Sequence, residues 1–267
     1  GRLLCWRGER QEPLLLISEP AFYLAAVPAV LLFGIAKGGF GGGLGVMAVP
    51  LMALVVSPVR AAAILLPILC LMDLVSLWAY RGRWVLAELR VLLPWSLAGI
   101  AAGTLLFGFM SPAVIRLMLG IIALAFTLHH WLQKTLDAAG DERVFPRRVG
   151  GAAAATAGFT SFIAHAGGPP ISMYLLRRGL DRTAFVATTV VFFAVVNYVK
   201  LVPYAWLGQL DASNLGTSLV LAPLAPIGVA LGVWMHNRVT DRFFFQVAYT
   251  LLFFVGLRLV WEGMRSL

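Results

Sequence analysis

The chain is poor in charged residues and in cysteine. Asp, Glu, Lys and Arg make up 12% of its 267 residues, against roughly 25% in an ordinary soluble domain. Its two cysteines, Cys5 near the N-terminus and Cys70 inside an apolar run, are not expected to meet. The composition therefore argues against a soluble globular domain and against a fold held together by disulfides.

Long apolar runs are abundant. Hydrophobic residues make up 60% of the chain and its mean hydropathy is +0.88. The longer runs approach the ~20 residues that a helix needs to cross a bilayer; they cover 61–80, 91–109, 113–132, 183–207, 217–236 and 243–261. Ser57-Pro58 and Ser111-Pro112 are typical helix starts. The sequence predicts an all-α, polytopic protein of the plasma (inner) membrane.

One apolar run, from Ala21 to Val56, is interrupted by a glycine cluster. The segment Lys37–Gly45 places one lysine beside six glycines, which should unwind the helix. In a bilayer, unwound backbone is tolerated where protein or a water-filled cavity satisfies it. The arm from Val46 to Val56 is too short to cross. We therefore expect a broken, re-entrant hairpin.

The same pattern returns later in the chain. A second break at 165–170 is followed by another short arm, and Pro94-x4-Gly99-x3-Gly103 is echoed by Pro223-x4-Gly228-x3-Gly232. We expect these paired glycines to serve helix packing. A hairpin plus three crossings leaves the second half on the opposite face, so the pattern predicts two inverted repeats, typical of transporters. The expected divisions are a lead-in at 1–20, a first repeat at 21–132, a linker at 133–148 and a second repeat at 149–267.

The net charge of +9 comes from basic residues between the apolar runs. It indicates membrane orientation rather than nucleic-acid binding. On the expected topology, twelve Lys and Arg residues fall on the face that holds the linker and seven on the other. The linker should be cytoplasmic and both termini outside.

Several short motifs resemble the TauE/SafE sulfite exporter family. The first half contains Gly41-Gly42-Gly43-x6-Pro50-Leu51 followed by Ser57-Pro58 and Ala61, and the second contains the more degenerate His165-Ala166-Gly167-Gly168-Pro169-Pro170. The resemblance implies a transporter of sulfite, sulfoacetate or a related sulfur-containing anion, usually pictured as an exporter.

The two breaks also suggest an anion site on physical grounds. Each returning half-helix should begin near mid-membrane, and helix N-termini attract anions. Lys37 would add a positive charge. We expect the substrate-binding residues to be Lys37, Gly41, Gly42, Gly43, Thr160, Ser161, His165, Gly167, Gly168 and Asn197, with Asp73 and Lys200 as coupling or ion-pair residues. We expect no metal and no cofactor.

Alternatives remain open for the ionisable residues. Asp73 lies mid-span, where it either pairs with a lysine or carries a proton. Lys37 and Lys200 could instead extend toward an interface, which we favour for Lys200. His165 is either part of a proton-coupled cycle or a satisfied hydrogen bonder. Asn197, which aligns with Asp73, either binds substrate or bridges helices. His236 is expected at the interface.

The favoured function is a secondary transporter, most simply an exporter, of a small sulfur-containing anion such as sulfite or sulfoacetate. It would work by alternating access at a midplane site between the repeats. Proton coupling and oligomeric state remain open. An importer or channel for another small anion is the main alternative. An intramembrane enzyme is disfavoured, because Asp73 has no second acidic partner in the spans.

Overall fold

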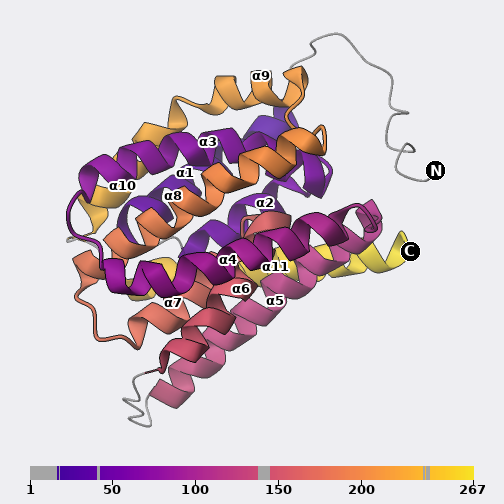
Figure 1. Ribbon diagram of the computed structural model, residues 1–267. Coiled ribbons are helices and arrows are strands. Elements are labelled where there is room, and N and C mark those ends of the chain that lie inside the picture. Colours follow the sequence, from indigo (N-terminus) through magenta and orange to yellow (C-terminus); the bar gives the residue numbers. More distant parts are fainter. Residues whose placement is uncertain (1–16, 18, 41–42, 138–144, 237, 239–240) are drawn as a thin grey trace.

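The computed structural model describes residues 17, 19–40, 43–137, 145–236, 238 and 241–267, and these form a helical bundle without strands (Figure 1). The elements, with η2 a 3₁₀-helix, are α1 (Pro20–Gly39), η2 (Gly43–Met47), α2 (Ala48–Met52), α3 (Pro58–Ala79), α4 (Leu86–Phe107), α5 (Pro112–Asp137), α6 (Arg147–Ala164), α7 (Gly168–Leu176), α8 (Arg182–Trp206), α9 (Ala212–Leu221), α10 (Leu224–Met235) and α11 (Asp241–Arg265).

Four of the six predicted spans, 61–80, 91–109, 113–132 and 183–207, are confirmed as helices that are long and apolar enough to cross a membrane. Within the described residues, α1, α3, α4, α5 and α8 are each long and apolar enough to cross a membrane. Figure 1 shows the end of α5 and the start of α6 at one end of the bundle, and the C-terminal end of α11 at the opposite end. Ser57 caps α3 as expected, accepting a hydrogen bond from the Arg60 N–H.

One predicted span is not a single helix. The run 217–236 lies in α9 and α10, which meet at an angle of 44° around residues 222–223. Pro223 and Pro226 lie at this break, and each lacks the N–H that would continue the helical hydrogen-bond ladder. Pro94, the repeat counterpart of Pro223, instead lies within a continuous α4.

Both predicted hairpins have a long first arm and a short second arm. α1 has 20 residues, enough to span alone, whereas the first return arm consists of η2 and the five-residue α2. In the second half, α6 has 18 residues and α7 has nine. The short second arms were predicted correctly. Gly41 and Gly42, like residues 1–16 and 18 of the predicted lead-in at 1–20, lie outside the described residues.

The two halves are interleaved. The first helix of each half packs against the other half, because α1 lies along α10 and α6 lies along α4. Two further contacts pair α3 with α8 and α5 with α11, which are counterparts in the predicted repeats. Gly120 meets Val260 while Gly263 meets Leu117, so α5 and α11 run antiparallel.

Glycines allow these helices to approach at backbone distance. A Cβ added at Gly34 would lie 2.8 Å from Gly228 Cα, and one at Gly38 would collide with the Val229 carbonyl. A Cβ at Gly99 would collide with the Ala155 carbonyl. The predicted packing role of the paired glycines is therefore confirmed. It also accounts for Gly38, although Gly38 belongs to the cluster in which a binding site was expected.

The α4–α6 contact generates a stability prediction. Gly99→Ala should lower the free energy of unfolding by about 1–3 kcal/mol, because the new methyl group must displace the α6 backbone. Gly108→Ala is the matched control, since its added Cβ would meet no atom within 4 Å. Thermal melting of the detergent-purified variants measures the difference. Equal melting temperatures would contradict the close packing.

Candidate functional site

A small internal cavity lies between the two halves. Its lining comes from α1, α3, α6, α7 and α8, and consists of Phe33, Lys37, Leu69, Ser161, His165, Gly168, Phe193 and Asn197. The space inside is about that of a single water molecule. Five predicted site residues therefore line one cavity, in a conformation that is closed around it.

An ion pair holds the first half of the site together. Lys37 Nζ lies 2.5 Å from Asp73 Oδ1 and donates to the Leu69 carbonyl at 3.2 Å. Asp73 is completely buried, and its Oδ2 accepts a hydrogen bond from Asn197 Nδ2 at 2.8 Å. Asn197 therefore does bridge helices, joining α8 to the ion pair. Lys37 is 3% exposed and does not extend to an interface.

The second half of the site is centred on Lys200, where the expectation of an interfacial side chain is wrong. Lys200 is 0% exposed. Its Nζ lies 3.0 Å from both the carbonyl and the Oγ of Ser161, and 2.8 Å from His165 Nδ1. The long side chain turns toward α6 because these acceptors satisfy its ammonium group inside the bundle.

His165 occupies the break between α6 and α7 in an uncommon conformation. Its φ is +51°, the one positive φ at a non-glycine residue in the described chain. Such a conformation costs of order 1–3 kcal/mol and tends to occur at functional sites. Its Nε2 lies 2.9 Å from the Ala62 carbonyl on α3. Because a carbonyl only accepts, Nε2 carries the hydrogen and Nδ1 faces Lys200.

Two tyrosines that sequence reasoning missed hold the ends of the first arms. Tyr80 donates to the Gly38 carbonyl at 2.5 Å and Tyr204 donates to the Phe162 carbonyl at 2.7 Å. Each tyrosine and each acceptor is separated from its counterpart by 124 positions. Asp73 and Asn197 have the same separation, so their common spacing to Tyr80 and Tyr204 was a signal available in the sequence.

His236 holds the first arm from another direction. It was expected at the interface, but it is 4% exposed and its Nδ1 lies 2.8 Å from the Gly39 carbonyl. The end of α1 leaves carbonyls without intrahelical donors. A buried end must satisfy them with side chains, which explains why His236 turns inward.

The remaining predicted site residues have mainly structural contacts. Thr160 Oγ1 lies 2.9 Å from the Thr156 carbonyl of its own helix and 3.1 Å from the Ala166 carbonyl within the break. A Cβ at Gly167 would lie 2.6 Å from the Ala157 carbonyl, so packing explains this glycine. Gly43 begins η2 rather than an α-helix.

The helix ends offer fewer donors than expected. α7 begins at Gly168, one residue before the expected start at Pro169-Pro170, and these two prolines lack two of the N–H groups of its first turn. In the first half the short α2 follows a 3₁₀ turn. The positive charge of the site therefore comes mainly from lysine side chains.

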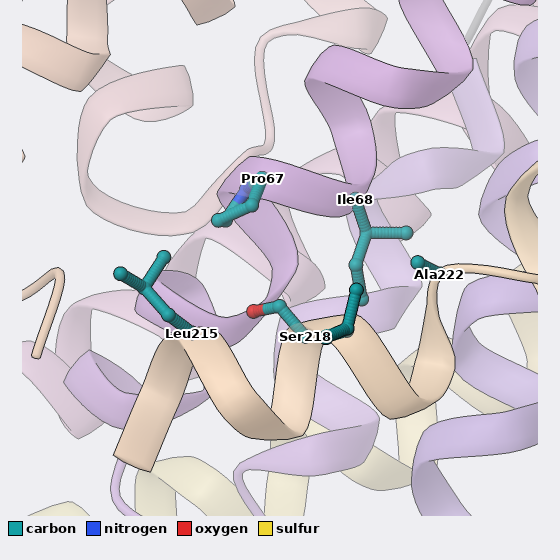
Figure 2. Close-up of a pocket in the computed structure, with 6 residues that line it drawn as sticks. Pro67, Ile68, Leu215, Ser218 and Ala222 are labelled. Carbon is teal, nitrogen blue, oxygen red and sulfur yellow. The ribbon is translucent and has the colours of Figure 1, made fainter. Parts of the chain in front are cut away.

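A second hollow lies away from these groups. Figure 2 shows Pro67 and Ile68 of α3 facing Leu215 and Ser218 of α9 and Ala222, which directly follows α9. The groove is apolar, and the Ser218 hydroxyl already donates a hydrogen bond to the Ile64 carbonyl at 2.7 Å. It lacks charged groups among its lining residues, so it does not suit an anion.

A further polar cluster fastens α7 to α4. Arg178 donates to Glu88 Oε1 from Nε at 3.0 Å and from Nη2 at 2.8 Å, and Tyr174 donates to Oε2. Hydrogen bonding to Glu88 raises the pKa of Arg178 above its usual value. These contacts hold the outer end of the short α7 arm.

Comparison with known proteins identifies the family. The family model described as sulfite exporter TauE/SafE matches residues 26–259, nearly the whole chain. The chain belongs to the TauE/SafE family. It is therefore a multi-pass membrane protein of a family of sulfur-anion transporters. No curated protein and no solved structure matches the chain.

The tyrosine contacts generate a prediction about the two arms. Tyr80→Phe and Tyr204→Phe should each lower the free energy of unfolding by about 1–3 kcal/mol, because each leaves a buried carbonyl unsatisfied. Tyr198→Phe is the control, since its 3.4 Å contact to the Cys70 carbonyl is long and its side chain is 41% exposed. Thermal melting compares all three, and a larger loss for Tyr198→Phe would contradict the assignment.

Proposed function

We propose that the protein exports a small sulfur-containing anion, such as sulfite or an organosulfonate, by alternating access at the cavity between its halves. The observation that carries the proposal is the closed cavity lined by Lys37 of one half and His165 of the other, with Lys200 directly behind it. Buried ammonium groups at membrane depth favour an anion over a neutral or cationic ligand.

The proposed architecture is two inverted repeats, residues 21–132 and 149–267. Its support is the crossed packing, in which α1–α10 and α4–α6 exchange under a two-fold relation while α3–α8 and α5–α11 pair with their own counterparts. The recurrence of the tyrosine-to-carbonyl contact at 124 positions adds to this. Inverted repeats place a substrate site at the interface between them.

We place the protein in the plasma (inner) membrane with the linker cytoplasmic and both termini outside, following the distribution of basic residues. In this orientation a membrane potential that is negative inside favours the outward movement of an anion. Export is therefore the direction that needs no additional energy source. Coupling of anion transport to proton movement would change the net charge moved per cycle, and with it the effect of the membrane potential on direction.

In the proposed cycle the described conformation is the occluded one. Opening the cavity to either side of the membrane requires the helices that line it to separate. The glycine-packed pairs α1–α10 and α4–α6 each move as a unit, because their backbones are in contact. An arriving anion accepts hydrogen bonds from Lys37 and Ser161, which already face the cavity. Because Glu88 lies on α4, a shift of α7 must either break the Glu88–Arg178 ion pair or carry α4 along with it.

Efflux from proteoliposomes tests the proposal. Vesicles loaded with radiolabelled sulfite should lose it faster when they contain the protein, and Lys37→Met should slow the efflux at least about tenfold by removing a buried cation from the site. Arg258→Met is the control, because Arg258 is 60% exposed and pairs with Glu262 at the surface. Efflux equal to that of empty vesicles would contradict the transport function.

A channel would be revealed in the same preparation. Reconstitution in a planar bilayer should give no single-channel current, because alternating access moves one substrate per conformational cycle. Resolved unitary currents carried by sulfite would replace the carrier by a channel.

A further inference from the structure

The charges buried around the cavity can be counted. Among the described residues, the ionisable side chains buried in its two networks are Lys37, Asp73, His165 and Lys200. Cys70, Tyr80 and Tyr204, which pack beside them, are a thiol and two phenols that are neutral at ordinary pH. Glu88 and His236 are also buried, but neither lines the cavity, because Glu88 pairs with Arg178 and His236 contacts the Gly39 carbonyl.

The Lys200–His165 hydrogen bond limits the charge of the second network. The two nitrogens lie 2.8 Å apart, and one hydrogen fits between them. His165 Nε2 already donates to Ala62. If both side chains were fully protonated, two N–H groups would face each other without an acceptor. The pair therefore carries at most one positive charge.

The first network adds no net charge. Lys37 and Asp73 are within ion-pair distance, and the pair sums to zero whether or not a proton moves between them. Asn197, which completes this network, is neutral. The closed site thus holds a net charge of at most +1.

We infer that this site selects anions by charge and accepts singly charged sulfur oxyanions, namely hydrogensulfite and sulfonates without a second acidic group, in preference to dianions such as sulfate and sulfoacetate. The inference rests on the proposed transport function and specifies its substrate class. A monoanion brings the occluded cavity to neutrality. A dianion leaves at least one uncompensated negative charge in a closed, water-poor site, which is costly.

Methanesulfonate and sulfate form a matched pair of ligands for the test. Both are tetrahedral at sulfur and differ by a methyl group in place of one oxygen, but they carry one and two negative charges at neutral pH. Isothermal titration of the detergent-purified protein should show methanesulfonate binding at least about tenfold tighter than sulfate. Equal affinities, or tighter binding of sulfate, would overturn the inference while leaving anion transport intact. Binding of neither ligand would count against both the inference and the proposed function.

Two variants test the charge count directly. Asp73→Asn removes the one buried carboxylate of the site, so the ratio of sulfate to methanesulfonate affinity should rise at least about tenfold. The double variant Lys37→Met with Asp73→Asn removes both members of the ion pair, so the monoanion preference should return. Size-exclusion profiles and melting temperatures confirm folding. If Asp73→Asn does not fold, the test rests on the double variant. Tighter binding of sulfate than of methanesulfonate by the double variant would overturn the inference.

Discussion

Two lysine side chains buried in the middle of an apolar bundle are the constraint on which the rest of the structure depends. An isolated ammonium group in such surroundings costs several kcal/mol. Each lysine is therefore surrounded by acceptors. Lys37 contacts Asp73 and the Leu69 carbonyl, whereas Lys200 contacts Ser161 and His165. The two sets of partners differ, because one includes a carboxylate and the other does not, and this difference in charge is the basis of the proposed anion site.

The helix breaks make these contacts possible. α1 ends two residues after Lys37, and α6 ends three residues after Ser161, so the functional groups lie beside ends whose carbonyls need partners. Tyr80, Tyr204 and His236 satisfy those carbonyls. Close glycine packing then holds α1 against α10 and α6 against α4. Glycines interrupt some helices of this chain, and at other positions they determine which helices can pack at backbone distance.

Much of this could be predicted from the sequence, for identifiable reasons. Long apolar runs gave the spans, and the spacing of Gly99 and Gly103 correctly indicated packing. The pairing of Asp73 with Asn197 followed from the repeat spacing, although their direct hydrogen bond did not. Lys200 was predicted to extend to the interface because it lies near the end of its span. This distance along the helix carries no information about the hydrogen-bond acceptors that a neighbouring helix presents.

Other features depend on tertiary contacts that the sequence pattern does not reveal. The inward orientation of His236 depends on α10 lying along α1, a contact between segments nearly 200 positions apart. The bend between α9 and α10 depends on local proline chemistry, yet Pro94 causes no such break in α4. The second run carries two prolines, Pro223 and Pro226, whereas the corresponding run in α4 carries Pro94 alone.

The central claim is that one anion site is shared by both halves of the molecule. Its most direct test is an experimental structure determined with an anomalously scattering monoanion, 2-bromoethanesulfonate. The account predicts that the sulfonate lies within hydrogen-bond distance of Lys37 Nζ and of Ser161 or His165, with the cavity enlarged around it. Sulfonate density confined to the groove between α3 and α9, or at the surface away from both lysines, would contradict it.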